Sequence, residues 1–543
     1  MKRKAVAAVL TAVMVASMFT GCGSDKGSSS AKSTSAASAA NDTVDEDGKV
    51  NGIMYQEGLP LVDEGAYTFS IFCDDSSESG EFIMLDEFKK QTNVDVDLKI
   101  YPYETATERL NLDLNSGDYA DVIGGWTLSD NAILTYGVNQ GVFIPLEDYF
   151  EKYCPNISAI LDLPGVREKM TAPDGHIYTI PYVCGDSTVG YSPYINTKWL
   201  ENVGMSMPTT TDEFEAVLKA FKEQDANGNG DASDEIPFST DPNNKHIEAM
   251  AGYFGLPMNK LGIAIQNEKV VYGGVSDTYR EFLSWFHKLY AEGLVDVELY
   301  TQDSSTWEGK GNQDLYGVSI AYGSGEFTGI PAAEERGDFD SMPVLNTDKD
   351  GIWLRDTEGF SVYRTQAVIT NKAEHPEIIC RWFDNAFALE NGIGCNRGPV
   401  GVIVNKEDDG YHAIDTTTLS EEDQEKYSWG NLWPQSLPKY LPADFEFVEE
   451  HPMYDEKKAT EEAYEANLTK EIIPSYWIDL DKIDTFSDTN TAIKDFFEQQ
   501  QAQFVCGELD IDNDADWQAY VDGMYSLGLE DWVATQGIEE IAK

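Results

Sequence analysis

Residues 67–73 read Tyr-Thr-Phe-Ser-Ile-Phe-Cys, an apolar run rich in residues that favour β-strands. Apolar side chains spaced for one face of a helix follow in residues 82–88. Residues 94–100, Val-Asp-Val-Asp-Leu-Lys-Ile, alternate apolar and polar as a strand does, and a helical pattern over 105–115 leads to a third apolar run at 120–123. Repeated strand–helix–strand units predict right-handed crossovers, and hence an α/β fold with a largely parallel sheet covered by helices.

Polar and aromatic residues follow the first and third of these strands. Asp74 and Asp75 come directly after the first strand, and Trp126 and Asp130 follow the third. The carboxyl ends of parallel strands meet at one edge of a sheet, where ligands bind in open α/β folds. We therefore expect a functional rim at this edge.

Length and charge narrow the class of protein. A chain of 543 residues is too long for one ordinary core and predicts several domain-sized units. Its 96 acidic and 38 basic residues give a formal net charge of -58, which argues strongly against nucleic-acid binding because a phosphate backbone needs a basic surface. The 28 tyrosines, 24 phenylalanines and 11 tryptophans can supply aromatic faces for a neutral polar ligand.

The N-terminus has the pattern of a secretory signal over residues 1–21. Three cations at positions 2–4 precede an apolar run at 5–19 that is too short for a stable membrane span. The run ends in Phe19-Thr-Gly-Cys22, which resembles the bacterial lipobox with Phe in place of the usual Leu. The resemblance implies that Cys22 is lipid-modified and becomes the new N-terminus. Residues 22–57 are then expected to form a flexible tether.

Four further segments resemble, in order, those of extracellular solute-binding proteins of ABC transporters. The first two read Gly-Asp-Tyr-Ala-Asp-Val-Ile at 117–123 and Gly-Val-Phe-Ile-Pro-Leu-Glu-Asp-Tyr at 141–149. The third reads Ala-Pro-Asp-Gly-His-Ile-Tyr-Thr-Ile-Pro at 172–181. The fourth reads Ile-Asn-Thr-Lys-Trp-Leu at 195–200, with Pro-Thr-Thr at 208–210. Residues 504–529 resemble the closing segment of the same family. The chain is most similar to its large lipid-anchored sugar-binding members, which serve carbohydrate importers.

The resemblance implies two lobes of the periplasmic-binding-protein-like (type II) α/β fold, joined by a hinge. Lobe 1 would comprise residues 58–182 and 363–405, and lobe 2 would comprise 190–355 and 406–543. Such a protein closes on its ligand because both lobes contact it. The implied function is to capture a sugar or oligosaccharide on the extracellular face of a Gram-positive type of cell membrane and to deliver it to an ABC permease. We expect a monomer, bound to the membrane through its lipid anchor only, that is not an enzyme.

A metal-binding loop is the clearest local motif. A helical pattern ends near residue 221, and residues 225–231 then read Asp-Ala-Asn-Gly-Asn-Gly-Asp. Oxygen side chains at positions one, three and five with Gly at six match the first half of an EF-hand loop. The alternative is a polar turn whose side chains merely satisfy backbone groups. Position twelve is Ile236, so the preceding Glu235 is the natural substitute for the usual bidentate Glu. We predict a structural Ca²⁺ held by Asp225, Asn227, Asn229, Asp231 and Glu235.

The chemistry of sugars selects the candidate ligand-binding residues. Aromatic rings pack against the C–H face of a pyranose, whereas carboxylates and guanidinium groups bind its hydroxyls. Trp126 and Asp130 resemble the family segment in which a Trp and an Asp reach the sugar. The full set of candidates is Trp126, Asp130, Asp74, Asp75, Trp307, Tyr322, Arg355, Trp429 and Trp433. Four other tryptophans lie in helical patterns typical of cores, namely Trp199, Trp285, Trp382 and Trp532.

Two other classes stay open on the residues alone. A secreted glycoside hydrolase or lyase works with two carboxylates, and 96 acidic residues make such pairs uninformative. The sequence contains no H-E-x-x-H, G-x-S-x-G or G-x-x-x-x-G-K-[ST] motif. A surface adhesin or sensor would fit the anchor and the charge but not the ordered importer-receptor segments.

Overall fold

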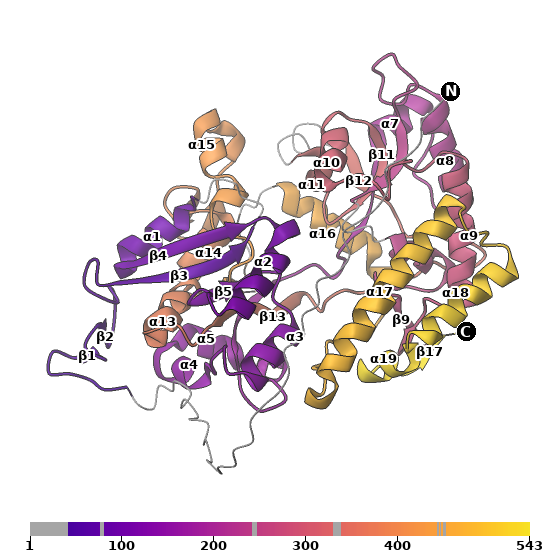
Figure 1. Ribbon diagram of the computed structural model, residues 1–543. Coiled ribbons are helices and arrows are strands. Elements are labelled where there is room, and N and C mark those ends of the chain that lie inside the picture. Colours follow the sequence, from indigo (N-terminus) through magenta and orange to yellow (C-terminus); the bar gives the residue numbers. More distant parts are fainter. Residues whose placement is uncertain are drawn as a thin grey trace, which may run out of the picture. The chain divides into compact units, whose positions relative to one another are not determined.

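The computed structural model describes residues 42–75, 81–241, 247–329, 338–442 and 452–542, together with 445, 447 and 448. The predicted signal sequence and Cys22 lie outside these residues. Two main β-sheets, each covered by helices, organise the described residues into two lobes (Figure 1). Among the described residues no helix is long and apolar enough to cross a bilayer.

A six-stranded sheet forms the centre of the first lobe. Its strand order is β16 (Tyr440–Leu441), β6 (Thr179–Gly185), β13 (Phe360–Ile369), β5 (Val122–Gly124), β3 (Tyr67–Asp74) and β4 (Val94–Tyr101). β3 pairs in parallel with β4 and β5, as the sequence predicts, whereas β13 runs antiparallel to β5 and β6. The connecting helices are α1 (Ile83–Thr92) and α2 (Tyr103–Ser116).

Neighbouring residues of β3 enter separate cores on the two faces of this sheet, because side chains alternate along a strand. Ile71 belongs to one core and Phe72 to the other. The Ile71 core is covered by α4 (Glu147–Tyr153), α5 (Pro155–Leu161), α6 (Val166–Met170), α13 (Pro376–Ala386) and α14 (Leu389–Arg397). The Phe72 core is covered by α2 and by the π-helix (Ile133–Asn139) that follows α3 (Asp130–Ala132).

The second lobe contains a four-stranded and a three-stranded sheet. The first has the order β12 (Phe339–Ser341), β7 (Ser192–Asn196), β11 (Tyr316–Ala321) and β8 (Ile236–Thr240). The second has the order β17 (Glu540–Ile541), β10 (Lys269–Tyr272) and β9 (Ile263–Gln266). Their helices are α7 (Thr197–Val203), α8 (Thr211–Glu223), α9 (Asp277–Ala291), α10 (Ser304–Asn312), α11 (Gly325–Thr328) and α16 (Pro452–Tyr464).

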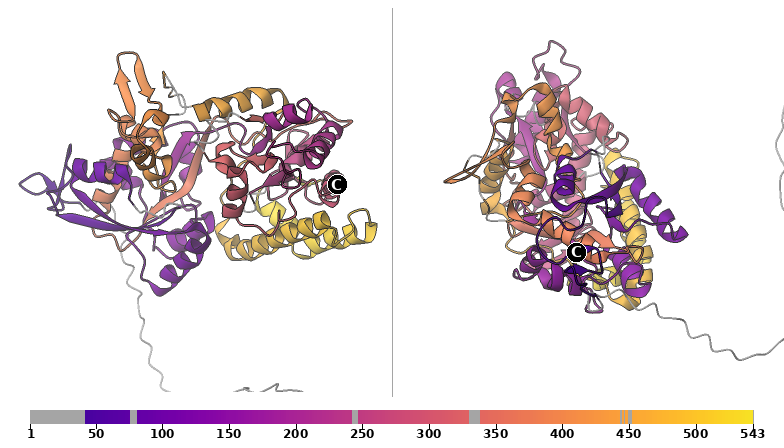
Figure 2. Two further views of the ribbon diagram at one scale, coloured as in Figure 1. Left: turned by 90° about the horizontal axis from the view of Figure 1, so that it is seen from above. Right: turned by 90° about the vertical axis from the view of Figure 1, so that its left-hand side faces the viewer.

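The C-terminal helices complete the core of this lobe. They are α17 (Ile483–Cys506), α18 (Asp514–Ser526) and α19 (Leu529–Thr535), drawn in yellow in Figure 2. Phe497 and Phe504 of α17 belong to the second-lobe core, whereas Ile483 at its start packs into the Phe72 core of the first lobe. The four tryptophans expected in cores are buried there or packed against them: Trp199, Trp285, Trp382 and Trp532.

The chain passes between the two main sheets more than once. β6 and β7 belong to different sheets, so residues 186–191 form one crossing, and a second lies between β12 and β13. The expected assignment of residues 406–543 to lobe 2 is wrong for their first part. β16 pairs with β6 in the first-lobe sheet, and Trp433 and Leu437 lie in the Ile71 core, so the chain does not leave the first lobe at 406.

Two smaller elements also belong to the first lobe. The β14–β15 hairpin (Val404–Glu407 and Gly410–Ala413) leads to α15 (Glu421–Lys426) and projects outward, orange in Figure 2. The expectation of a tether through residue 57 is wrong at its end, where β1 (Lys49–Val50) pairs with β2 (Met54–Tyr55). Val50 and Met54 are buried in the Ile71 core, which gives this segment the apolar anchor that a free tether lacks.

Candidate ligand-binding site

A partly exposed aromatic cluster lies where β5, β6 and β13 meet. Trp126 follows β5 by two residues, and 45% of its surface is exposed. Its ring meets Tyr363 edge-on at 5.2 Å between ring centroids and lies 6.5 Å from Tyr182. Tyr363 stands opposite Tyr182 in the β13–β6 pairing, and the two rings stack at 5.5 Å. The three rings offer a ready surface for an apolar ligand face.

Asp74 is buried beneath this cluster and is not part of the ligand-facing surface, which corrects its prediction as a ligand-binding residue. Its carboxylate accepts hydrogen bonds from the backbone N–H groups of Trp126 (3.0 Å) and Thr127 (2.6 Å). Gly125 allows this approach, because a Cβ at that position would stand 2.4 Å from Asp74 Oδ1. Asp74 therefore holds the loop that carries Trp126.

Asp75 is also buried, contrary to its prediction as a ligand-binding residue. Its Oδ2 accepts a hydrogen bond from the backbone N–H of Gln435 at 2.7 Å. Residues 433–439 lie over the end of β3: the hydroxyl of Ser436 donates to the carbonyl of Asp74. A segment more than 350 residues away in the chain thus covers both aspartates.

Asp130 is held by an ion pair that the sequence did not reveal. Arg364 of β13 donates from Nε and Nη2 to the two carboxylate oxygens of Asp130 at 2.8 and 2.5 Å. The same guanidinium lies 4.1 Å from the ring centroid of Trp477 and donates to the carbonyl of Tyr476. Such a bidentate pair, in which Arg364 is nearly buried, fixes the loop after β5 to strand β13.

Asp130 and Arg355 line one cavity of about 620 Å³, to which the two lobes and residues 473–491 contribute. Arg355 is largely occupied by protein groups. Its Nε donates to the carbonyl of Thr469 at 3.1 Å, and its Nη2 pairs with Glu465 at 3.2 Å. Arg355 therefore serves to fasten the second crossing rather than to present a free guanidinium.

On the second-lobe side, Tyr322 follows β11 and is 36% exposed. Its hydroxyl donates to Asp186 Oδ1 at 3.1 Å, while Tyr363 donates to Asp186 Oδ2 at 2.8 Å. Asp186 lies in the 186–191 crossing, so one carboxylate joins a tyrosine from each lobe. Sequence reasoning missed Asp186, Tyr182 and Tyr363. The only signal was that they lie in or beside residues 183–189 and 356–362, which separate the predicted lobe segments.

Titratable groups surround this junction. Lys457 of α16 lies 3.9 Å from the Tyr322 ring centroid and donates to the carbonyls of Tyr322 (2.7 Å) and Gly190. Burial lowers the pKa of Lys457 to about 8. Burial also raises the pKa of Glu326 to about 7 and that of Asp356 to about 6. The crossing therefore carries charges that change near neutral pH.

The three remaining tryptophan candidates divide between surface and core. Trp429 is 49% exposed beside the first-lobe cluster, consistent with a loop platform. Trp433 is fully buried and stacks on Trp382 at 5.7 Å, and Trp307 is 3% exposed with its indole N–H donating to Ser319. The predictions that Trp433 and Trp307 contact ligand are wrong, because each fills the core beneath its segment.

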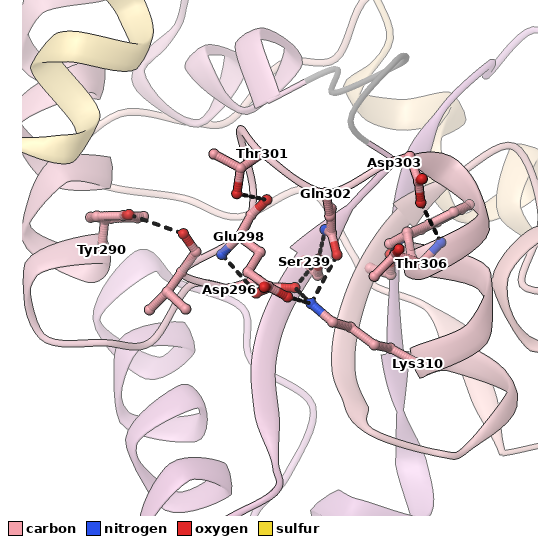
Figure 3. Close-up of polar contacts among 12 residues, drawn as sticks. Ser239, Tyr290, Asp296, Glu298, Thr301, Gln302, Asp303, Thr306 and Lys310 are labelled. Atoms are coloured by element: carbon pink, nitrogen blue, oxygen red, sulfur yellow. Dashed lines mark hydrogen bonds and ion pairs between the residues drawn. The ribbon is translucent and has the colours of Figure 1, made fainter.

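Figure 3 shows why α10, which carries Trp307, is rigidly placed. Lys310 of α10 donates to Asp296 at 2.9 Å, Glu298 at 2.7 Å and Gln302 at 2.9 Å. Ser239, at the end of β8, donates to the same buried carboxylate of Asp296 at 3.1 Å. This cluster joins α10 to the four-stranded sheet and has a structural role.

The predicted metal-binding loop connects α8 to β8. Asp225 Oδ2 accepts from the N–H of Gly230 at 3.0 Å, and Glu235 Oε1 accepts from the N–H of Ala226 at 2.9 Å. The other oxygens, Asp225 Oδ1 and Glu235 Oε2, are buried and have no hydrogen-bond partner in the described part of the chain. Burial raises the pKa of Glu235. Two unsatisfied carboxylate oxygens in one loop fit a hard divalent cation.

The Asn side chains of this loop are held by hydrogen bonds within it. Asn227 Oδ1 accepts from the N–H of Asn229, and Asn229 Oδ1 accepts from the N–H of Asp231. Asp234 binds the side-chain amide groups of both asparagines at 3.2 and 2.7 Å, which fixes their orientation. The sequence did not predict this role for Asp234. Asp231 itself accepts from Ser233.

The lobes, the crossings and the aromatic cluster define a two-lobed binding protein, and comparison with known proteins places it in a family. Residues 76–392, more than half of the chain, match the bacterial extracellular solute-binding protein family. The chain therefore belongs to this family, as the sequence motifs predicted. The expectation that it is a binding protein and not an enzyme is confirmed by this membership.

Three of the matches come from Streptococcus pneumoniae. The fructooligosaccharide ABC transporter substrate-binding protein FusA (serotype 4, strain ATCC BAA-334 / TIGR4) is 32% identical over 379 residues, covering 67% of this chain and 68% of FusA. The solved structure of FusA in complex with kestose matches with a TM-score of 0.76 at 26% identity, covering 86% of this chain and 98% of that one. A FusA EF-hand mutant in complex with fructo-nystose matches at 27% identity with a TM-score of 0.73 and the same coverage.

Proposed function

We propose that this protein captures an oligosaccharide between its two lobes and delivers it to the permease of an ABC importer. The observation that carries the proposal is the cluster of Trp126, Tyr182 and Tyr363 on the first lobe, joined through Asp186 to Tyr322 of the second. Rings from both lobes stand at one crossing, so a sugar that packs against them would be held by both lobes at once.

The similarity to FusA supports a saccharide ligand of the same general kind, a short neutral oligosaccharide. Closure would follow from differential binding: the ligand contacts both lobes only in the closed form and therefore stabilises that form. The Asp186 carboxylate, which already accepts from one tyrosine of each lobe, lies where it could also accept a hydroxyl of the sugar.

We further propose that Cys22 is lipidated and anchors the chain to the extracellular face of the membrane. The lipobox-like residues 19–22 support this, and the membrane then contacts the protein only through the anchor. We also propose that Asp225, Asn227, Asn229, Asp231 and Glu235 hold a structural Ca²⁺. The unsatisfied oxygens of Asp225 and Glu235 support this site, as does the EF-hand of the similar FusA protein.

The test is calorimetric titration of the protein, without residues 1–21, against kestose, nystose and a panel of other neutral and acidic oligosaccharides. Saturable binding to at least one saccharide, with the saccharide recovered unchanged by chromatography, is the expected result. Absence of binding across the panel, at concentrations up to about a millimolar, would overturn the assignment of a sugar ligand.

A further inference from the structure

Lys439 is a buried cation beneath the exposed aromatic residues of the first lobe. It immediately precedes β16, and only 1% of its surface is exposed. Its Nζ lies 5.5 Å from the ring centroid of Trp429 and 5.6 Å from that of Tyr182. Both distances are within the range of cation–π attraction, which is stronger for a desolvated cation. One ammonium therefore interacts with two rings that belong to distant parts of the chain.

A hydrogen-bond relay connects the same ammonium to the backbone of Trp429. Lys439 Nζ donates to Gln435 Oε1 at 3.1 Å. Gln435 Nε2 then donates to the carbonyls of Trp429 (2.8 Å) and Trp433 (3.1 Å). A protonated lysine can only donate, so it holds the amide oxygen of Gln435 toward itself and the amide nitrogen toward Trp429.

The relay also reaches the loop after β3. The backbone N–H of Gln435 donates to Asp75 Oδ2 at 2.7 Å. Asp75, which the sequence had suggested as a ligand contact, is thereby placed behind the ligand-facing surface. The negative charge of Asp75 partly offsets the positive charge of Lys439. The core below this surface thus contains a built network of an ammonium, an amide and a carboxylate.

Other titratable groups also face Lys439. The Asp75 carboxylate favours its charged form, whereas Arg397 at the end of α14 opposes it. Cys184 on β6 and Cys395 on α14 also face Lys439, and burial raises the pKa of both thiols, so they stay neutral. Burial outweighs these influences and lowers the pKa of Lys439 to about 8. The charge on this side chain is therefore lost within a pH range in which the folded protein can be studied.

We propose that Lys439 is a positioning residue for ligand binding, whose ammonium fixes Trp429 and Tyr182 in the orientation that receives the sugar. The inference rests on the proposed function, because its consequence is a change in saccharide affinity. Lys439 acts without touching the ligand: it orients Tyr182 through the ring and Trp429 through both the ring and the Gln435 relay.

The experiment compares the wild type with Lys439→Met, which retains an apolar stem of similar length and removes the charge. We expect saccharide affinity to fall about tenfold in the variant at pH 7. As the pH rises from 7 to 9.5, the affinity of the wild type should fall more steeply than that of the variant, because Lys457 titrates in both proteins and Lys439 only in the wild type. Lys426→Met is the matched control, because Lys426 is exposed, lies 4.8 Å from the Tyr427 ring in the same segment, and should leave affinity unchanged.

A second measurement needs no ligand. The fluorescence of Trp429 is obtained as the difference between the wild type and Trp429→Phe, and is followed from pH 6.5 to 9.5. We expect a transition near pH 8 that is lost when the same difference is measured in the Lys439→Met background. This readout reports the cation beside the indole and not the overall stability of the fold. If Lys439→Met fails to fold, Lys439→Gln and the wild-type titration give the same test.

The outcomes separate the two proposals. If no saccharide binds the wild type but the Trp429 transition is present and depends on Lys439, the sugar assignment fails and the positioning role stands. If saccharides bind equally well to the wild type and to Lys439→Met, with the same pH profile for both, the positioning role of Lys439 is overturned and the proposed function stands. A Trp429 signal that is insensitive to Lys439 would also count against the role.

Discussion

The burial of Lys439 predicts an unusual dependence of stability on pH. In the folded protein its pKa is lowered from 10.5 to about 8, chiefly because burial disfavours the charged form. Below pH 8 both the folded and the unfolded chains carry the proton, and the folded state bears the full cost of burying the charge. Between pH 8 and 10.5 the folded state releases the proton while the unfolded chain keeps it. The free energy of unfolding must therefore rise with pH over this interval.

The magnitude follows from the size of the shift. A difference of about 2.5 pKa units corresponds to about 3 kcal/mol in total, of which about 2 kcal/mol is gained between pH 7.5 and 9.5. Lys439→Met lacks this titration. Relative to the variant, the wild type should therefore become more stable by about 2 kcal/mol across that range. Lys457 also has a pKa lowered to about 8, but it is present in both proteins and cancels in the comparison.

The assay is urea unfolding followed by circular dichroism at half-unit pH intervals from 7.5 to 9.5. The quantity of interest is the difference in unfolding free energy between the wild type and Lys439→Met at each pH. A difference that stays constant, or that moves in favour of the variant as pH rises, would refute the conclusion that Lys439 is buried as a cation. Lys426→Met, which alters an exposed lysine, should follow the wild type throughout.

Three further outcomes are expected. Trp126→Ala should weaken saccharide binding by about tenfold or more with little change in melting temperature, because the ring is half exposed; a titration showing unchanged affinity would remove Trp126 from the binding surface. Trp433→Ala should instead destabilise the protein by about 3–5 kcal/mol in urea unfolding, because the indole is fully buried in the core. A loss of unfolding free energy below about 1 kcal/mol would contradict that placement. Asp225→Asn should abolish any loss of melting temperature caused by a calcium chelator. The control is Glu407→Gln, in the Glu407–Asp409–His412 group of the β14–β15 hairpin, which should leave that loss unchanged. A wild-type protein whose melting temperature is indifferent to chelation would argue against the ion.

Local patterns were sufficient for much of the fold. The apolar and alternating runs at 67–73, 94–100 and 120–123 became β3, β4 and β5 in the expected parallel pairing. The periodicity and composition of a segment predict such elements, because the alternation of apolar and polar residues along a strand indicates which of its side chains are buried. The loop at 225–235 could be found for a related reason: its candidate ligands are close in sequence, so their spacing alone predicts where their oxygens converge.

The candidate site depended instead on contacts between distant segments. Asp186 could be recognised only once the fold brought Tyr322 and Tyr363 to its two oxygens. Likewise Asp130 is paired by Arg364, which lies 234 residues away. No periodicity in a single sequence records such pairs, because each partner fits its own strand or loop equally well without the other.

Trp429 and Trp433 show most clearly the limit of prediction from the sequence alone. Both lie in one short segment, 428–434, that contains one Gly and one Pro, and nothing in that segment distinguishes an exposed ring from a buried one. The amino-acid order alone was sufficient to predict the α/β class, the family and a candidate ion-binding loop. Tertiary packing decided that Trp433 fills a core beside Trp382, that Trp429 stays at the surface, and that Asp74 and Asp75 are covered by residues 433–439. Burial is a property of what a distant segment covers, and therefore it appears only when the whole chain has folded.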